Sequence, residues 1–281
     1  MKRTKKINMF KKHIKYTTKR KYKKKKIQTG GNLDNYHFYV VNLEDRKDYF
    51  DKLKPTFDKR KLTLNKFKAI DTRTLDTRIF DIIPNIDRFL NNKDNEDGYN
   101  TRYKDEIITD RRKLGSLGCC FSHIKLYNQI VKDNIPNMVI IEDDAVLDPD
   151  FFDKFGKLVS DLPEDWDMVF LGISCAYSHD DRCKKNDGII KVKDNLYNIN
   201  YIYGTYGYLI NNKAAKKILE NIFPIWWHID TMLSYLIVKQ KIKAYCTIPN
   251  LIFHPGNFSI DSVKYNMDTP YTSYKTTLNT G

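Results

Sequence analysis

Apolar runs and amphipathic stretches alternate along most of this chain. The clearest run is 138–141, where four consecutive apolar residues are typical of a strand buried on both faces. Similar runs predict further strands at 37–43, 67–71, 166–172, 204–210 and 243–248, and residues 197–203 are also rich in strand formers. Helical spacing predicts helices from about residue 47 to Pro55 or slightly beyond, and at 115–131, 151–159, 214–219 and 224–237. This alternation predicts an α/β fold.

Polar stretches divide the chain and mark its ends. They predict loops at 91–100, 180–188 and 249–262, the last of which carries His254. We expect one domain over residues 34–262, between a basic tail at 1–33 and a polar tail at 263–281. A hydrophobic content of 41% is enough for a substantial core in a chain of 281 residues.

Three consecutive carboxylates follow the run at 138–141. Glu142, Asp143 and Asp144 stand in the short loop before the helix at 151–159. Ligands of open α/β sheets bind beyond the carboxyl ends of strands, and adjacent carboxylates repel one another unless protons or a cation intervene. A hard divalent cation is the natural partner. The alternative from these residues alone is an acidic turn that faces water.

Other polar residues at element ends allow two interpretations each. Asn42 and Arg46 follow the first strand, where they could grip a nucleotide or cap a solvated turn. Small residues that include Gly115 and Ser122 allow a backbone or a ligand to come close, and His123 is either a packing or a catalytic histidine. Gly204 and Gly207 within a predicted strand indicate a close neighbour or a ligand.

Two tryptophans stand beside possible acid–base residues at the start of the helix at 224–237. Trp226 and Trp227 could form a platform for a sugar, with His228 and Asp230 nearby to act on a proton. They could equally be core aromatics, with Asp230 as an acid that favours the helix dipole.

The net charge of +14 is concentrated in the first residues. Residues 1–26 contain 14 basic and no acidic side chains, which leaves 35 of the 49 basic residues to balance 35 acidic ones. The body is therefore neutral and offers no distributed basic face for nucleic acid. The tail is interpreted as a solvated, disordered segment, or as one that contacts nucleic acid or another anionic surface.

Neither a secretory signal nor a membrane anchor is visible. The tail lacks the apolar centre of a signal peptide, and no run of about 18 apolar residues occurs. We therefore expect a soluble protein and favour the cytoplasm. The five cysteines form no paired framework and no CxxC site, so buried thiols in a reducing compartment are expected; Cys175 and Cys183 could be bridged in a secreted protein.

Several segments together resemble one family, the glycosyltransferases that include lipopolysaccharide galactosyltransferases and procollagen galactosyltransferases. They occur in family order between about residues 36 and 262: Val41-Asn42-Leu43 with Arg46, 68–71, 115–123, 140–145, Trp166-Asp167 with Leu171-Gly172, 204–219, and His228-Ile229-Asp230. The Gly-x-x-Gly-Cys-x-x-Ser-His and Glu-Asp-Asp pieces are the most telling. The resemblance implies a GT-A type fold with a mostly parallel sheet, and a UDP-sugar donor, with galactose as the expected hexose.

The resemblance also implies roles for individual residues. Glu142, Asp143 and Asp144 take the place of the motif that holds Mn²⁺, or another divalent cation, against the donor diphosphate. Asn42, Arg46 and Asp143 are implied for the nucleotide, with Gly115, Ser122 and His123 lining the same crevice, and His254 is a minor option as a further metal ligand. The family's β-linked products imply an inverting transfer to a hydroxyl acceptor on a protein or a glycan, with Asp230 as the base and His228 orienting either Asp230 or the acceptor. The alternatives are an inactive family member that binds a glycan or a partner protein, and a nucleic-acid-associated protein that works through its basic tail.

Overall fold

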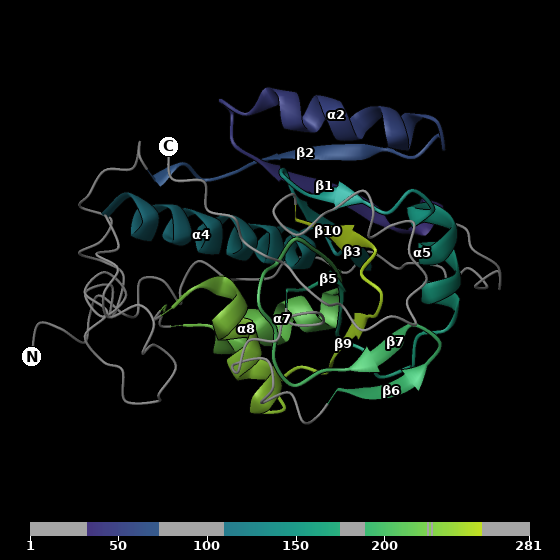
Figure 1. The fold of residues 1–281 in the computed structure, drawn as a ribbon. Helices are drawn as coiled ribbons and strands as arrows, with labels where there is room; N and C mark the ends of the chain where they lie inside the picture. The colour runs from purple at the N-terminus through teal and green to yellow at the C-terminus, as the bar shows by residue number, and fades with distance from the viewer. Residues whose placement is uncertain (1–32, 73–109, 175–188, 224, 226, 255–281) are drawn as a thin grey trace, which may run out of the picture.

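The computed structural model describes residues 33–72, 110–174, 189–223, 225 and 227–254 (Figure 1). In these residues one large mixed sheet has the strand order β2-β1-β3-β8-β5-β9-β7-β6. The strands are β1 His37–Asn42, β2 Leu64–Lys68, β3 Asn137–Glu142, β5 Met168–Gly172, β6 Ile190–Lys193, β7 Leu196–Asn198, β8 Gly207–Asn211 and β9 Ala244–Thr247. A separate two-stranded ladder pairs β4 Val146–Leu147 with β10 Ile252–Phe253.

Most strands of the large sheet share one direction. β1 runs parallel to β2 and β3, and β5 runs parallel to β9. β8 is antiparallel to both β3 and β5, and β7 is antiparallel to both β6 and β9. β7 and β8 therefore oppose all the others in the described sheet, and the expected α/β fold with a mostly parallel central sheet flanked by helices is confirmed.

Helices cover both faces of this sheet (Figure 1). They are α2 Lys47–Asp58, α4 Asp110–Lys132, α5 Phe151–Ser160, α7 Asn212–Asn221 and α8 Ile229–Val238, after a short 3₁₀ turn at Leu33–Asn35. Met138 and Ile140 of β3 pack in a core with α4, α7 and α8. Val139 and Ile141, which point the opposite way, pack in a second core with α2 and α5. This alternation explains why the run at 138–141 is apolar throughout.

The sequence placed most elements correctly and misplaced several. The second strand is 64–68, not 67–71: Leu64 and Phe67 are the buried residues of this strand, which ends where Asn42 pairs with Lys68. α4 begins before the predicted start, at Asp110. β8 begins only at Gly207, and of 197–203 only the first two residues belong to a strand, β7. β6 and the two-residue strands β4 and β10 were not predicted.

Several sequence predictions lie outside the described residues. These are the basic tail at 1–32, the loops at 91–100 and 180–188, Trp226, the polar tail at 263–281, and the Cys175–Cys183 alternative. None of the described helices is both long enough and apolar enough to span a membrane.

Candidate functional site

The predicted site residues gather at one edge of the sheet. β1 and β3 end there, and the antiparallel strand β8 begins there. The register pairs Val41 with Glu142 and Ile141 with Gly207. β5 ends at the same edge, where Gly172 pairs with Gly207. Ligand sites form at this type of edge because several loops converge on it.

Asp143 fastens the loop after β1 to the loop after β3. Its Oδ2 accepts a hydrogen bond from Asn42 Nδ2 at 2.9 Å and a longer one from the backbone N–H of Leu43 at 3.4 Å. Its Oδ1 lies 3.0 Å from Arg46 Nη1 in an ion pair. Asn42 Nδ2 also donates to the carbonyl of Arg46 at 2.9 Å. The Asp143 carboxylate is thus buried, and both of its oxygens already have partners.

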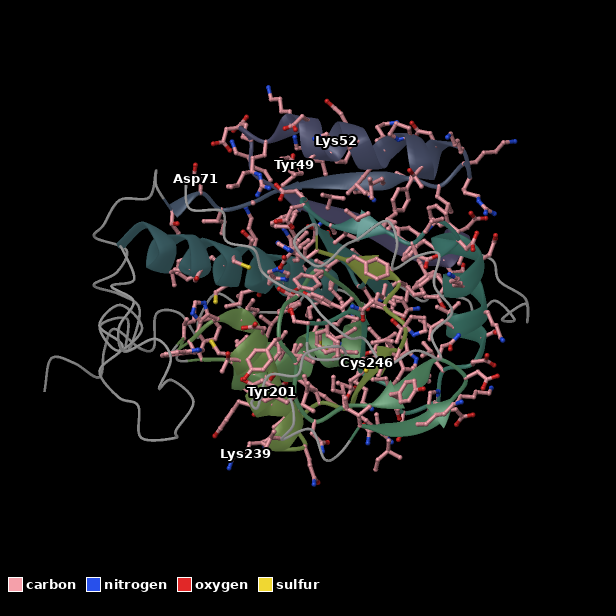
Figure 2. The ribbon with its side chains drawn as sticks, in the orientation of Figure 1. Tyr49, Lys52, Asp71, Tyr201, Lys239 and Cys246 are labelled. Atoms are coloured by element: carbon pink, nitrogen blue, oxygen red, sulfur yellow. The ribbon has the colours of Figure 1, made fainter. Side chains whose placement is uncertain are left out.

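Arg46 lies between two acidic groups and an aromatic ring. Its Nη2 is 4.0 Å from Asp144 Oδ2, and its guanidinium carbon is 4.2 Å from the centre of the Tyr49 ring. Tyr49 and Lys52, labelled in Figure 2, belong to α2, and Lys52 Nζ lies 4.7 Å from the same ring centre. About a third of the Arg46 side chain remains exposed (34%), so the guanidinium can still meet an anionic ligand.

Asp144 lies between Arg46 and the end of the β4–β10 ladder. Its Oδ2 lies 3.6 Å from His254 Nε2, and both side chains are partly exposed, 27% for Asp144 and 40% for His254. Partial burial and, after it, the negative charge of Glu142 raise the pKa of Asp144. A carboxylate oxygen and an imidazole nitrogen therefore face each other at the rim of the site.

Glu142 turns toward the interior. Its Oε1 accepts a hydrogen bond from Thr205 Oγ1 at 2.5 Å and lies 3.6 Å from His123 Nε2. Burial alone would raise the pKa of Glu142, but the contact with His123 and the Thr205 hydroxyl together lower it. Its backbone N–H donates to the carbonyl of Tyr206 at 3.0 Å, so the residues before β8 hold both ends of Glu142.

His123 is fully buried at the head of a hydroxyl chain. Its Nδ1 is 2.6 Å from Tyr208 Oη, which is 2.7 Å from Tyr127 Oη. The His123 and Tyr208 rings are stacked with centroids 5.6 Å apart. His123 therefore lies beneath Glu142 rather than in the open crevice.

Ser122 forms hydrogen bonds with two backbone groups, and Gly118 lies close to another backbone segment. Ser122 Oγ accepts from the N–H of Ile70 at 2.8 Å and donates to the carbonyl of Gly118 at 2.7 Å. A Cβ on Gly118 would lie 2.7 Å from the Ile70 carbonyl oxygen, whereas one on Gly115 would meet nothing within 4 Å. These contacts hold the segment that leaves β2, where Asp71 is labelled in Figure 2, against α4. Gly118 thus allows two backbone segments to approach closely, whereas Gly115 borders open space.

Asp230 lies at the first turn of α8 and ties it to the turn before β8. Its Oδ2 accepts from the N–H of Gly204 at 2.9 Å, and its Oδ1 accepts from the N–H of Thr231 at 2.7 Å. Gly204 has φ of +81°, and a Cβ there would lie 2.7 Å from the Tyr206 ring. His228 directly precedes α8, and its ring lies edge-on to Trp227 at 5.7 Å.

The acids Glu142, Asp144 and Asp230 belong to one neighbourhood, because Thr205 donates to Glu142 and the adjacent Gly204 donates to Asp230. Burial first, and then the charges of these three groups, raise the pKa values of the Cys119 thiol and the Tyr206 phenol. The same three acids act on both groups, so the structure brings Asp230 into the neighbourhood of the acidic loop.

The neighbours of the strand glycines are internal. A Cβ on Gly172 would overlap the carbonyl oxygen of Ile252, and one on Gly207 would lie 2.3 Å from Ile252 Cδ1. Ile252 belongs to β10, so these glycines let the segment that carries His254 lie directly against the sheet. The glycine pattern thus indicated a close neighbour rather than a ligand.

Comparisons with known proteins decide the family. Residues 35–233 match the model of glycosyltransferase family 25 (LPS biosynthesis protein), which is most of the chain. The chain belongs to this family. A glycosyltransferase 25 family member of Aedes aegypti is 29% identical over 206 residues, covering 70% of this chain and 31% of the relative. Procollagen galactosyltransferase 2 of Homo sapiens is 24% identical over 211 residues, covering 74% and 31%.

This family 25 chain spans about a third of the length of those relatives. Among solved structures, mouse xyloside xylosyltransferase 1 in its apo form aligns over 72% of this chain and 68% of that one, with 12% identity and a TM-score of 0.35. A TM-score this low carries no argument. The family assignment therefore rests on the family match, and the fold class rests on the observed sheet. The matched residues include the acidic loop and Asp230, and end before His254.

The family 25 site contains groups that sequence reasoning overlooked. Thr205 and Tyr206 hold Glu142, while Tyr208 and Tyr127 hold His123. The two glycines that flank Thr205 and Tyr206 were the available signal, because they marked this segment as unusual. Cys119 is a third such group, and it lies partly exposed beside Glu142 and His123.

Proposed function

We propose that this chain is a metal-dependent glycosyltransferase that moves a hexose, galactose in the first instance, from its UDP form to a hydroxyl acceptor on a protein or a glycan. The family and its procollagen galactosyltransferase relatives support the reaction class. The observation that carries the metal-dependent part is the facing pair of Asp144 and His254, 3.6 Å apart at the carboxyl edge of the sheet.

The ligand atoms of Asp144 and His254 suit a divalent cation. Asp144 supplies an anionic oxygen, His254 an imidazole nitrogen, and both are partly exposed, so a cation can reach them without unfolding the site. We propose Asp144 as the principal ligand. Glu142 and Asp143 remain proposed ligands, but each would have to share or release a hydrogen bond that it makes now. When bound, such a cation supplies positive charge that stabilises the departing UDP.

Arg46 and Asn42 are the proposed nucleotide contacts. Asp143 holds the guanidinium of Arg46 at 3.0 Å, which fixes its direction and leaves donors for an anionic ligand. Asn42 is fully buried and, within the described residues, orders the loop itself by donating to Arg46 and Asp143. We therefore propose direct contact with the donor diphosphate for Arg46, and a supporting role for Asn42.

The proposed transfer inverts the configuration at the sugar, with Asp230 as the base that takes the acceptor proton. Asp230 has neighbours in Gly204 and Thr231, and its carboxylate is held by their N–H groups. A carboxylate fixed in this way has a defined direction and can accept a further hydrogen bond from a hydroxyl. His228, two residues earlier, is proposed to orient the acceptor.

The test is release of UDP from a panel of UDP-sugars by the purified chain, with and without Mn²⁺. Turnover of UDP-galactose only in the presence of Mn²⁺ is expected, and Asp144→Asn should abolish it while the variant still unfolds cooperatively. Asp150→Asn is the matched control, because it makes the same change to an exposed carboxylate at the start of α5, which lies 3.9 Å from Lys154 Nζ. No turnover, together with no rise in Tm on adding UDP and Mn²⁺, would favour an inactive glycan- or partner-binding protein.

A further inference from the structure

A second group of possible metal ligands lies behind the acidic loop. One ligand atom each from Cys119, His123 and Glu142 lie within 4.8 Å of one another. Among the residues that the structure describes, this is the one group of three or more that meets that spacing, and the acidic triplet itself does not meet it. The three side chains come from α4 and from the end of β3.

His123 presents an unused nitrogen to this group. Its side chain is 0% exposed, and its Nδ1 is engaged with Tyr208 Oη at 2.6 Å. Its Nε2 has no hydrogen-bond partner among the described residues and lies 3.6 Å from Glu142 Oε1. A buried polar atom left without a partner carries a free-energy cost, and a ligand that binds there would remove it.

We propose that Cys119, His123 and Glu142 form a binding site for a thiophilic divalent cation of the Zn²⁺ class, with water in the fourth position. It shares Glu142 with the site proposed for the donor metal but differs from it in chemistry. Thiolate and imidazole ligands select Zn²⁺, whereas carboxylates and water suit Mn²⁺. The proposal does not depend on the proposed function, because it concerns binding in the absence of nucleotide.

The spacing suits tetrahedral coordination. Bonds of about 2.0–2.3 Å from zinc to nitrogen, oxygen and sulfur place the ligand atoms of a tetrahedral site roughly 3.3–3.8 Å apart. The 3.6 Å between His123 Nε2 and Glu142 Oε1 is already in that range. The remaining separations of up to 4.8 Å require small side-chain movements.

The surroundings supply the outer contacts that a metal-bound histidine needs. When Nε2 is a ligand, Nδ1 carries the proton and donates it to Tyr208 Oη, which can in turn donate to Tyr127 Oη. Thr205 Oγ1 already donates to Glu142 Oε1, and a carboxylate oxygen has a second lone pair for a metal. The hydroxyl chain can reverse its direction, so it supports His123 with or without the metal.

The two adjacent cysteines differ in exposure, which makes Cys120 a matched control for Cys119. Cys119 and Glu142 are both partly exposed, with 24% exposure for the Glu142 side chain, so solvent reaches the edge of this group. Cys120 is buried, and its Sγ contacts the carbonyl oxygen of Trp227 at 3.5 Å. The proposal therefore predicts that Cys119 binds the metal ion and that the neighbouring Cys120 does not.

The test measures metal binding by the full chain without UDP, in a Cys175→Ser/Cys183→Ser background that removes the two cysteines outside the described residues. Zn²⁺ affinity is measured by calorimetry, and Co²⁺ is used as a spectroscopic probe for a thiolate-to-metal absorption band. One Zn²⁺ and a clear band are expected for the background chain and for Cys120→Ser. Cys119→Ser should lose the band and about 100-fold or more in affinity, since even outer contacts are worth about 10–100-fold.

Retention of the band or of Zn²⁺ affinity in Cys119→Ser would overturn the proposal, as would absence of Zn²⁺ binding in the background chain. If Asp144→Asn loses Zn²⁺ binding and Cys119→Ser keeps it, the ion belongs to the donor-metal site instead. If Cys119→Ser fails to fold, alkylation of folded Cys120→Ser keeps the test decisive. Zn²⁺ should protect Cys119 from iodoacetamide there, and equal labelling with and without Zn²⁺ would reject the site.

Discussion

His254 Nε2 lies 3.6 Å from Asp144 Oδ2, and neither residue sits within a strand of the large sheet. The short ladder between β4 and β10 brings them together, because Phe253 pairs with Val146 just beyond the acidic loop. The backbone reinforces this pairing, with Asp148 N–H donating to Leu251 at 2.9 Å and Leu251 N–H donating to Leu171 at 2.7 Å. The rim of the site is thus built by residues from two distant parts of the chain.

His254→Ala should weaken binding of Mn²⁺ in the presence of UDP by roughly 10–100-fold, the effect of losing one strong polar contact of about 1.5–3 kcal/mol. The physical reason is the loss of the imidazole that faces Asp144. Calorimetric titration with Mn²⁺ measures it. His37→Ala is the control, since that exposed histidine begins β1 at its far end. Equal Mn²⁺ affinity in His254→Ala and the parent chain would remove His254 from the metal site.

Arg46→Ala should weaken UDP binding by about 10–100-fold, because the site loses a charge-assisted donor. Arg46→Lys should recover only part of the loss, since a lysine cannot reach Asp143 and a phosphate with the same fork of donors. Fluorescence or calorimetric titration with UDP provides the measurement. Lys54→Ala removes an exposed positive charge from α2, the helix that follows Arg46, and should leave the affinity unchanged. A similar loss in both alanine variants would indicate a general charge effect.

Ser122→Ala should lower the free energy of unfolding by about 1–3 kcal/mol, because the partly buried N–H of Ile70 loses its partner. A chain of this size loses about 2–4 °C in Tm for each kcal/mol. The affinity for UDP should stay within a factor of two or so of the parent value. Ser160→Ala, which removes an exposed hydrogen bond, is the control. A large loss of UDP affinity without loss of stability would instead make Ser122 a ligand contact.

Gly118→Ala and Gly115→Ala should have opposite effects on stability. At Gly118 the new Cβ would lie 2.7 Å from a backbone oxygen that is held by its own segment, so α4 and Ile70 must separate. At Gly115 the Cβ enters open space, and alanine should stabilise the helix by roughly 0.5–1 kcal/mol. Denaturant unfolding of the two variants checks both signs. If Gly115→Ala abolishes UDP binding while raising stability, the open space at Gly115 belongs to the donor site.

Asp230→Asn should reduce turnover by at least about 100-fold, the usual contribution of a general base, and leave the affinity for UDP nearly unchanged. The amide keeps one oxygen to accept the N–H of Gly204, so the turn before β8 should survive. Steady-state kinetics with UDP binding measured in parallel separates the two effects. A large loss of UDP affinity would place Asp230 in the donor site rather than on the acceptor side.

Sequence patterns predicted the elements that depend on their own residues. The runs at 138–141 and 168–172 are apolar throughout because both faces of β3 and β5 are covered, and helices α5, α7 and α8 show regular apolar spacing. β2 was shifted by three residues because Ala69 and Ile70 are apolar for another reason. They lie on the segment that packs against α4, where Ile70 bonds to Ser122.

The side-chain partners in the site could not be read from the sequence. Asn42, Arg46 and Asp143 were each candidates, but their mutual bonding depends on β1 and β3 being neighbours. The sequence allows His123 to be a packing or a catalytic residue, and its actual setting between Tyr208 and Glu142 depends on β8. The two-residue strands β4 and β10 are too short to leave a pattern, so the pairing of His254 with Asp144 was visible only in three dimensions.

The insertion of β8 between β3 and β5 also governs the order in which the protein can assemble on the ribosome. β1, β2 and β3 can pair as soon as residue 142 has emerged. The other edge of β3 then remains unpaired until β8 has been made. At about 5–20 residues per second, synthesis as far as Asn211 takes several seconds more. During that interval β5 has neither of its neighbours, since β9 is the last strand of the large sheet to be made. Two apolar strands, β3 and β5, then present unpaired edges that can bind other chains. The strand that completes the site is thus also the one whose late arrival leaves the nascent chain exposed to aggregation.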